Sequence, residues 1–562
     1  MRSGAVNASS ERYMDVERLW PHLPDEWHIG RAVDLVAIAK PSEVDEAPRV
    51  TAGGNDVLIR LVRACGHRAD APEVEGWQSI LSPIAKPRRG RRNARSCSGV
   101  VCIALQPGAM AEFVNAQTQG GVAITYVAGV ENWPHRGTAA EAGVEGGLAT
   151  MGVGYRVLRQ KGRRALLELT TTTDEIDIAR AIRKLGYHVS GDESGDQAER
   201  TGRMFLHRRT VTWGTRSFEA PLPAAFSRFL DGAPEILEER LGQALRRRYA
   251  LARDPATSSF RLLDDERDMT IDRYGEDLVL SCYSNLDERT DAATFTRAIA
   301  AENRRAAGIG ETLGARRVYL KIRPKQANTI VNAAAAGLAP KEPVWGPSRG
   351  NDERAIAVEN DVRYWVKLGQ GLGTGLFLDQ RDNRRWIRDH ATDKRILNTF
   401  AYTCAFSVAA AVGGARRTVS IDAAAPALEV GRANFALNDA DDPQTHDTIR
   451  GDVFNWLPRM ARRGDRFDVV ILDPPSYSRV RKRRFSAMRD YADLVATAVD
   501  LLDEGGWLLA SVNHTKMSRR RLHQAVIDGC GRRRRKIVAV EHRICGVDHP
   551  SGRMKSLLAR VA

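Results

Sequence analysis

Cysteine and aromatic residues are scarce in this chain of 562 residues, which has seven cysteines and 6% aromatic side chains. The cysteines are scattered, their number is odd and no CxxC pair occurs, which argues against a disulfide framework and against a zinc site. We therefore expect buried, reduced cysteines, no metal and a cytoplasmic protein. They are Cys65, Cys97, Cys102, Cys282, Cys404, Cys530 and Cys545.

Long apolar runs are also missing. No uninterrupted stretch could span a bilayer, and the first 20 residues lack the apolar core of a signal peptide. Secretion and membrane insertion are therefore disfavoured. The hydrophobic share of 43% is ordinary for globular proteins, and the length predicts two to four domains.

Basic residues are in excess, with 85 Lys and Arg against 70 Asp and Glu and a formal net charge of +15. Such an excess suits a polyanionic partner, because each neutralised phosphate releases counterions. A GC-rich genome that favours arginine codons would produce the same bias. Composition alone leaves these two interpretations about level.

Strands and helices alternate over the last two hundred residues, which predicts an α/β domain with a doubly wound parallel sheet. Such sheets bind ligands beyond the carboxyl ends of their strands. The predicted strands are 395–400, 417–422, 468–475 and 507–513, and the predicted helices are 406–415 and 425–438.

Two acidic residues, Asp422 and Asp473, stand at the ends of predicted strands, and Asp452 lies between these strands in the segment GDVFNW. A carboxylate in this position can bind ribose hydroxyls, but singly each is more often a helix N-cap. Together on successive strands they favour a ligand site. Asp473 opens the motif Asp-Pro-Pro-Ser-Tyr, in which the two prolines fix the backbone and Tyr477 could stack on a flat base.

The segment from about 234 to the end resembles class I S-adenosylmethionine (SAM) methyltransferases, and within them the large-subunit rRNA methyltransferases of the RlmI/RlmK-like group. The motifs that carry the resemblance are TGLFLDQRDNR (374–384), LNTFAYTCAFSVAAAVGGA (397–415), SIDAAAPALEVGRANFALN (420–438) and LDPPSYSR (472–479). The resemblance implies a Rossmann-like SAM domain, a small α+β module before it, and rRNA as the partner.

The resemblance also implies the residues of the site. The cofactor would contact Phe377, Asp379, Gln380, Arg381, Asn398, Phe400, Ala401, Asp422, Asp452 and Asp473. The catalytic set would be Asp473, Pro474, Pro475, Tyr477 and Asn513. For the FLDQR segment, the alternative is that an Asp–Arg pair simply braces a turn.

Two departures from the family pattern bear on function. Cys404 and Ala405 stand where the first loop of the family has Gly-Gly, which puts SAM affinity in doubt. The cysteine that cytosine-C5 enzymes use as a nucleophile is absent from the segment 511–516, where Asn513 and Lys516 occur instead. We therefore expect guanine-N7 methylation, which needs positioning but no covalent adduct.

Basic clusters flank this site. Arg481, Lys482, Arg483 and Arg484 directly follow the Asp-Pro-Pro motif, where contact with RNA phosphates is the favoured interpretation. Further clusters at 519–521 and 532–536 could equally be a solvated basic surface.

In the first half, residues 34–43 predict a strand and a turn, 98–116 a strand and a helix, 122–131 a strand, and 165–192 a strand and a helix, and the apolar spacing over 234–254 predicts a further helix. Taken together, the segments within about 30–230 resemble RluA-type pseudouridine synthases, which implies an α+β fold. Its catalytic pattern is broken, since Ala94 replaces the nucleophilic Asp and the stretch 174–179 lacks the paired arginine, although Tyr126 matches the active-site tyrosine. We expect a catalytically dead domain kept for RNA binding or for stabilising the other half. Phosphate would be held by Arg88, Arg89, Arg91 and Arg92.

The predicted organisation is a lead-in (1–29), a degenerate synthase-like domain (30–230), a central α+β module (231–350) and a methyltransferase domain (351–562). The leading hypothesis is a SAM-dependent methyltransferase of 23S rRNA. The alternatives are an inactive RNA-binding ribosome-assembly factor and residual pseudouridine synthesis. The sequence gives no oligomeric state.

Overall fold

The computed structural model describes most of the chain. The described residues are 13–46, 55–84, 96–134, 148, 151–192, 203–233, 236–265, 268–284, 292–324, 337–350, 354–480, 483–514, 516–543, 546, 548–549 and 553–562. They divide into two compact units, one formed by 16–253 and the other by 254–562 together with the first fifteen residues. Within the described part, no helix has the length and apolar character needed to cross a membrane.

The unit formed by 16–253 is built on a mixed nine-stranded sheet with the order β1-β2-β4-β8-β5-β7-β6, on which β3 pairs with β4 and β9 with β8. Its strands are β1 His28–Arg31, β2 Leu35–Lys40, β3 Gln78–Ser79, β4 Ser98–Ala104, β5 Val122–Val130, β6 Val153–Lys161, β7 Arg164–Thr171, β8 Leu206–Trp213 and β9 Arg216–Glu219. Its helices are α1 Val16–Leu19, η1 Asp25–Trp27, α2 Val57–Ala64, η2 Pro72–Val74, α4 Pro107–Thr118, α5 Ile178–Lys184, α6 Ala225–Asp231 and α7 Leu237–Ala252.

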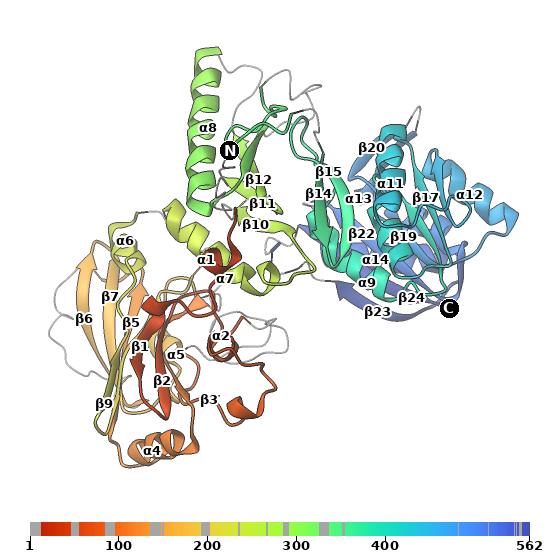
Figure 1. The fold of residues 1–562 in the computed structure, drawn as a ribbon. Coiled ribbons are helices and arrows are strands. Elements are labelled where there is room, and N and C mark those ends of the chain that lie inside the picture. Colours follow the sequence, from red (N-terminus) through yellow and green to blue (C-terminus); the bar gives the residue numbers. More distant parts are fainter. Residues whose placement is uncertain are drawn as a thin grey trace, which may run out of the picture. The chain divides into compact units, whose positions relative to one another are not determined.

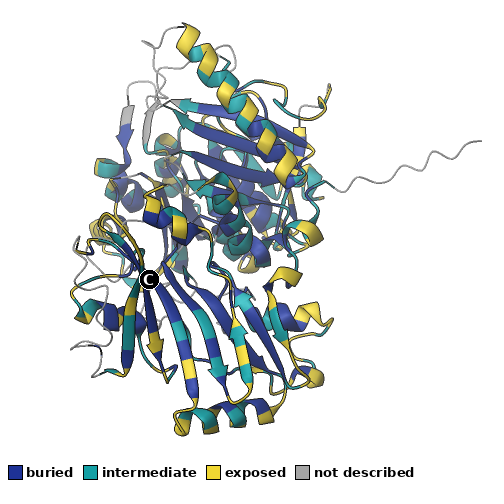
Figure 2. Ribbon diagram, turned by 90° about the vertical axis from the view of Figure 1, so that its left-hand side faces the viewer, coloured by how far each residue is buried: buried dark blue, intermediate teal, exposed yellow. Residues whose placement is uncertain are grey.

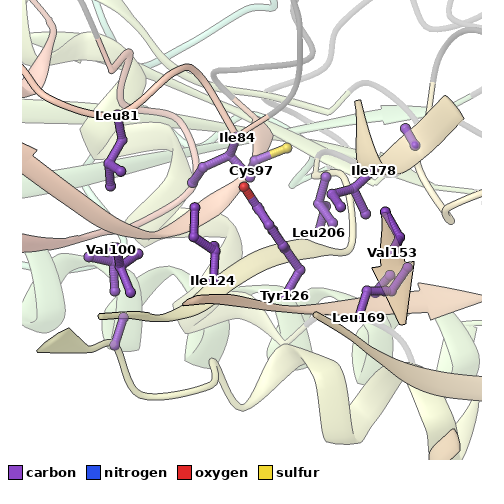
Figure 3. Packing of buried hydrophobic residues seen from close by; sticks show 14 of the residues in the cluster. Leu81, Ile84, Cys97, Val100, Ile124, Tyr126, Val153, Leu169, Ile178 and Leu206 are labelled. Atoms are coloured by element: carbon purple, nitrogen blue, oxygen red, sulfur yellow. The ribbon is translucent and has the colours of Figure 1, made fainter. Parts of the chain in front are cut away.

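The core of this unit lies between the sheet and the helices that cover it. Figure 3 shows Tyr126 of β5 packed among aliphatic side chains, with Ile124, Leu206 and Cys97 around it. The strand and helix predicted within 98–116 are β4 and α4, the strand predicted at 122–131 is β5, and the strand and helix predicted within 165–192 are β7 and α5. The helix predicted at 234–254 is α7, and it belongs to this unit.

The other unit begins with a four-stranded sheet in the order β10-β11-β12-β13, with the long helix α8 packed along it (Figure 1). Its elements are β10 Ser259–Asp265, β11 Met269–Tyr274, β12 Asp277–Ser284, α8 Ala292–Leu313 and β13 Arg317–Pro324. A hairpin of β14 Arg354–Glu359 and β15 Val362–Lys367 leads from it to η5 Leu378–Gln380 and α9 Arg381–Asp389. Strands β10 to β13 and helix α8 lie within 231–350, the segment in which a small α+β module is expected, whereas α7 from the same segment belongs to the other unit.

A seven-stranded sheet follows, in the order β18-β17-β16-β19-β22-β24-β23. Its elements are β16 Arg395–Thr399, α10 Ala405–Val412, β17 Arg417–Asp422, α11 Ala425–Leu437, β18 His446–Arg450, α12 Val453–Arg463, β19 Phe467–Leu472, α13 Ala487–Val499, β22 Leu502–Asn513, α14 Arg519–Arg532, β23 Ile537–Arg543 and β24 Met554–Val561, with the hairpin β20 Tyr477–Val480 and β21 Arg483–Ser486 beside it. Strands β18, β17, β16, β19 and β22 run parallel to one another, and β24 runs antiparallel to β22. The predicted Rossmann-like α/β architecture is confirmed for this part.

Helices cover both faces of this sheet. One apolar cluster joins the sheet to α12, α13 and α14, and another joins it to α9 and α10, while α11 packs with α10 and β15 in a third. Figure 2 shows buried residues running along the strands and exposed residues gathering on helices and turns. Neighbouring β16 and β19 carry their connections to opposite faces, which opens a crevice at their carboxyl ends.

Candidate active site

A cavity of about 390 Å³ lies at the carboxyl ends of β16, β17, β19 and β22. Its volume is typical of small-molecule sites. Its lining residues are Phe377, Phe400, Tyr402, Asp422, Ala423, Gly451, Asp452, Val453, Phe454, Asp473, Pro474, Pro475, Ser476, Asn513 and Met554. Carboxylates, aromatic rings and backbone groups thus surround one space.

The first loop of the site has a strained backbone. Phe400, Tyr402 and Cys404 all have a positive φ, between 49° and 59°, which non-glycine residues rarely adopt. Hydrogen bonds hold this conformation, since Tyr402 donates its N–H to Asp422 at 2.8 Å and Cys404 donates its N–H to Ala401 at 2.7 Å. The loop therefore has one fixed shape around the cavity.

The unusual Cys404 is accommodated by a glycine on the neighbouring helix. Its side chain is fully buried, and a Cβ at Gly431 of α11 would lie only 2.5 Å from the Cys404 sulfur. Because Gly431 has no side chain, it leaves room for the Cys404 side chain at a position where the family's loop has glycine. The cysteine does not block the cavity, because it is absent from its lining.

Asp422 and Asp452 each have a structural as well as a ligand-facing position. Asp422 accepts the N–H groups of Tyr402 and Ala424 at 2.8 Å, and Asp452 caps α12 by accepting the Phe454 N–H at 3.1 Å. Both also line the cavity. A carboxylate has about four acceptor sites, so these bonds leave capacity for ribose hydroxyls.

Asp473 stands at the end of β19, where a chain of side chains orients its carboxylate. Asn383 donates to Gln380 at 2.6 Å, Gln380 donates to Ser511 at 3.1 Å, and Ser511 donates to Asp473 at 2.7 Å. Burial raises the pKa of Asp473 to about 6; the Ser511 hydrogen bond opposes this rise and the nearby Asp379 charge adds to it. Ser511 and Asn383 were not predicted as site residues, although Asn383 lies in the motif 374–384 and Ser511 begins the segment 511–516.

Some residues of the FLDQR segment line the cavity, and others stabilise the surrounding structure. Phe377 lines the cavity with 55% of its surface exposed, whereas Gln380 is part of the chain to Asp473. Arg381 is buried and forms two bonds of 2.6 and 2.7 Å with Asp548, not with Asp379. Arg384 similarly pairs with buried Glu359 and donates to the Phe377 carbonyl at 2.8 Å. Both arginines therefore stabilise the structure around the cavity, as the alternative interpretation of this segment predicts, although their acidic partners are Asp548 and Glu359.

Other predicted residues lie beside the cavity or outside it. Asn398 is buried and donates to Ser407 at 2.9 Å, and Ala401 is buried next to Phe400, so neither belongs to the lining. Pro474, Pro475 and Asn513 do line it. For Tyr477, Arg483 and Arg484 the structure describes only the backbone, in strands β20 and β21. The remaining predicted positions lie outside the described residues; they are Arg88, Arg89, Arg91, Arg92, Arg481 and Lys482.

This lining fits SAM. Asp422 and Asp452 offer acceptors for a ribose, Phe400 and Phe454 offer aromatic surface for an adenine, and Asp473 offers a carboxylate for a sulfonium cation. Bound there, SAM supplies an electrophilic methyl group. Several lining residues went unpredicted, including Phe454 and Met554, because apolar side chains carry no distinguishing pattern.

Known proteins match this part of the chain. A sequence model of the S-adenosylmethionine-dependent methyltransferase family matches residues 347–531. YwbD of Bacillus subtilis, a provisionally named ribosomal RNA large subunit methyltransferase, is 34% identical over 328 residues, which are 57% of this chain and 75% of that protein. Ribosomal RNA large subunit methyltransferase I of Escherichia coli K12 is 32% identical over 321 residues, 56% of this chain and 76% of that protein.

A solved Streptococcus mutans protein assigned as a SAM-dependent methyltransferase is 26% identical, with a TM-score of 0.47, over 57% of this chain and 80% of that one. The identity to the two ribosomal RNA methyltransferases extends over three quarters of their length. The chain therefore belongs to the family of S-adenosylmethionine-dependent ribosomal RNA large subunit methyltransferases.

Proposed function

We propose that the protein methylates 23S rRNA, and that the acceptor is N7 of a guanine. The observation that carries the choice of atom is the chemistry of the cavity lining, which among the described residues contains carboxylates, an amide and aromatic rings but no cysteine. Methylation at cytosine C5 needs a thiolate that adds to C6 of the base.

The described cysteines of this domain are unsuited to that role. Burial raises the pKa of Cys404 to about 12 and that of Cys530 to about 11, so both thiols stay protonated at neutral pH. Cys530 is a buried residue of α14 and does not line the cavity. Cys545 lies outside the described residues and is addressed by the experiment below.

Transfer to N7 asks for little from the protein besides position. The N7 lone pair forms the new N–C bond while the C–S bond breaks and its electron pair stays on sulfur. No proton leaves, and the guanine ring gains a positive charge. Alignment of the two reacting atoms supplies most of the acceleration, and the nearby Asp473 carboxylate stabilises the new charge.

A cysteine substitution distinguishes the two reactions. We expect Cys545→Ala to methylate rRNA as the unchanged protein does, with 7-methylguanosine as the nucleoside product. Loss of methylation in Cys545→Ala, together with unchanged SAM binding by calorimetry, would contradict the N7 assignment and indicate a covalent mechanism. Cys530→Ala is the matched control, since its thiol is packed within α14.

We further propose that the segment 30–230 is a pseudouridine-synthase-like domain that binds RNA without synthase chemistry, in a cytoplasmic protein. Tyr126, the counterpart of the synthase tyrosine, is buried in the core (Figure 3). Arg208 donates to its hydroxyl at 3.3 Å. Arg208 also donates to Val100 and Ser82 carbonyls, so its guanidinium is engaged within the core. RNA incubated with the protein should acquire no pseudouridine, and deletion of 86–95 should weaken RNA binding.

A further inference from the structure

A second cavity, of about 380 Å³, adjoins the one described above and shares Phe377 and Asn513 with it. One wall comes from the four-stranded sheet and the other from the segment 372–379. The wall residues from the sheet are Arg261, Asp272, Tyr274, Val279, Ser281, Tyr283, Lys321 and Arg323. The shared residues place this cavity next to the site of methyl transfer.

Three buried polar atoms on residues that line this cavity have no hydrogen-bond partner among the described residues. They are Asp379 Oδ1, Arg323 Nε and His549 Nε2. His549 is 6% exposed, and its Nε2 lies 3.6 Å from the Asp548 carboxylate, beyond hydrogen-bond distance. A buried polar atom without a partner is costly, so one acceptor and two nitrogens at one cavity indicate a polar ligand.

The remaining surface is suited to a flat ring. Leu376, Leu378 and Val279 provide apolar contact, and Phe377 presents an exposed ring at the border of the two cavities. The Phe377 ring lies 5.6 Å from that of Tyr402, which also lines the first cavity. Exposed aromatic rings of this kind serve as stacking surfaces for nucleobases.

We propose that this second cavity holds the Watson–Crick edge of the target guanine, with Asp379 as the residue that selects it. This inference rests on the proposed methylation of guanine N7. Guanine presents two adjacent donors, N1–H and N2–H, to which a carboxylate can bond, and an acceptor, O6, for a donor such as Arg323. Cytosine presents the opposite order, and adenine lacks the pair of donors.

The two cavities then divide the base between them. N7 belongs to the imidazole ring of guanine, on the far side of the base from N2. A guanine gripped by its Watson–Crick edge in the second cavity therefore presents N7 away from Asp379, toward the cavity that binds SAM. Lys321 supports the wall, since its ammonium donates to the Gly371 and Gly373 carbonyls at 3.0 and 3.1 Å.

The test uses the full chain, loaded with S-adenosylhomocysteine, and pentamer RNA probes with a uridine on each side of a variable central base. The central bases are guanine, inosine, adenine and 7-deazaguanine, and affinity is measured by fluorescence anisotropy. Inosine lacks only the N2 amino group, so we expect it to bind about 10-fold more weakly than guanine, because it loses one charge-assisted hydrogen bond. The 7-deazaguanine probe should bind as guanine does, and when SAM replaces S-adenosylhomocysteine it should accept no methyl group.

The deciding variant is Asp379→Asn, which keeps the size of the side chain and removes its charge. We expect it to lose the preference for guanine over inosine while it binds SAM normally, because Asp379, which the resemblance assigned to the cofactor, lines the second cavity and not the first. Asp389→Asn is the matched control, because Asp389 is exposed near the end of α9 and pairs with Arg388. A guanine preference that survives in Asp379→Asn, or no preference in the unchanged protein, would overturn the inference.

The proposed N7 reaction is measured separately. If rRNA acquires 7-methylguanosine but the probes show no dependence on Asp379, only the assignment of the second cavity fails. If the rRNA product is another nucleoside, the N7 proposal fails whatever the probes show.

Discussion

The packing of Gly431 against Cys404 allows a direct test of how the protein maintains the conformation of the loop 400–404 at the SAM cavity. Gly431 lies in α11, where an alanine would normally be preferred over glycine by about 0.5–1 kcal/mol. Here a Cβ would lie 2.5 Å from the Cys404 sulfur and 3.0 Å from its Cβ. Both distances are far below ordinary contact at roughly 3.5–4 Å.

Overpacking of this kind costs about 1–3 kcal/mol, which exceeds the gain in helix propensity. We therefore expect Gly431→Ala to destabilise the methyltransferase domain by about 1–2 kcal/mol, or to lower its melting temperature by about 2–8 °C. The displaced Cys404 moves the loop that carries Tyr402, so SAM affinity should fall several-fold. Gly308→Ala is the control, since nothing lies within 4 Å of its Cβ in α8.

Calorimetry identifies the relevant transition as the one that SAM shifts upward. In the Gly431→Ala background, Cys404→Gly removes the clashing sulfur and relieves the positive φ of residue 404, so it should restore stability and SAM affinity. Gly308→Ala should be more stable than the unchanged protein, because only the gain in helix propensity applies there. If Gly431→Ala is stabilised in the same way and its SAM affinity is unchanged, the packing argument is wrong. The same holds if Cys404→Gly rescues neither property.

Three further predictions concern the charges of the site. SAM affinity should rise as the pH increases through about 6, because Asp473 becomes ionised there and attracts the sulfonium; a calorimetric titration should show this rise, and it should be absent in Asp473→Asn. Asp422→Ala should weaken SAM binding about 10-fold or more and abolish methylation, since a ribose acceptor and the bonds to Tyr402 and Ala424 are lost together, whereas exposed Asp441→Ala should behave as the unchanged protein. Replacing the four basic residues 481–484 by glutamine should lower the salt dependence of RNA binding, with the slope of log K against log salt falling by about 3; an unchanged slope would exclude this segment from phosphate contact.

The sequence predicted the parallel sheet and the cavity because both depend on local signals. The sequence itself shows apolar strands that end in acidic residues and the two prolines after Asp473. In the structure, Asp422, Asp452 and Asp473 line one cavity, as predicted. Each is also held by hydrogen bonds within the protein, which is why the N-cap interpretation could not be dismissed from the sequence.

Other features depend on contacts between distant segments. Arg381 pairs with Asp548 across 167 residues, and Gln380 donates to Ser511, which holds Asp473, across 131 residues. The compensation between Cys404 and Gly431 arises likewise from the packing of the first loop against α11. The second cavity needs strands β10 to β13 beside the segment 372–379, an arrangement that no single motif encodes.

The most direct test of the account is the identity of the methylated nucleoside. Purified protein would be incubated with methyl-labelled SAM and rRNA from a strain that lacks the gene, and the RNA digested to nucleosides for mass spectrometry. The account predicts labelled 7-methylguanosine. Labelled 5-methylcytidine, or no labelled nucleoside in rRNA from a protein that binds SAM, would contradict it.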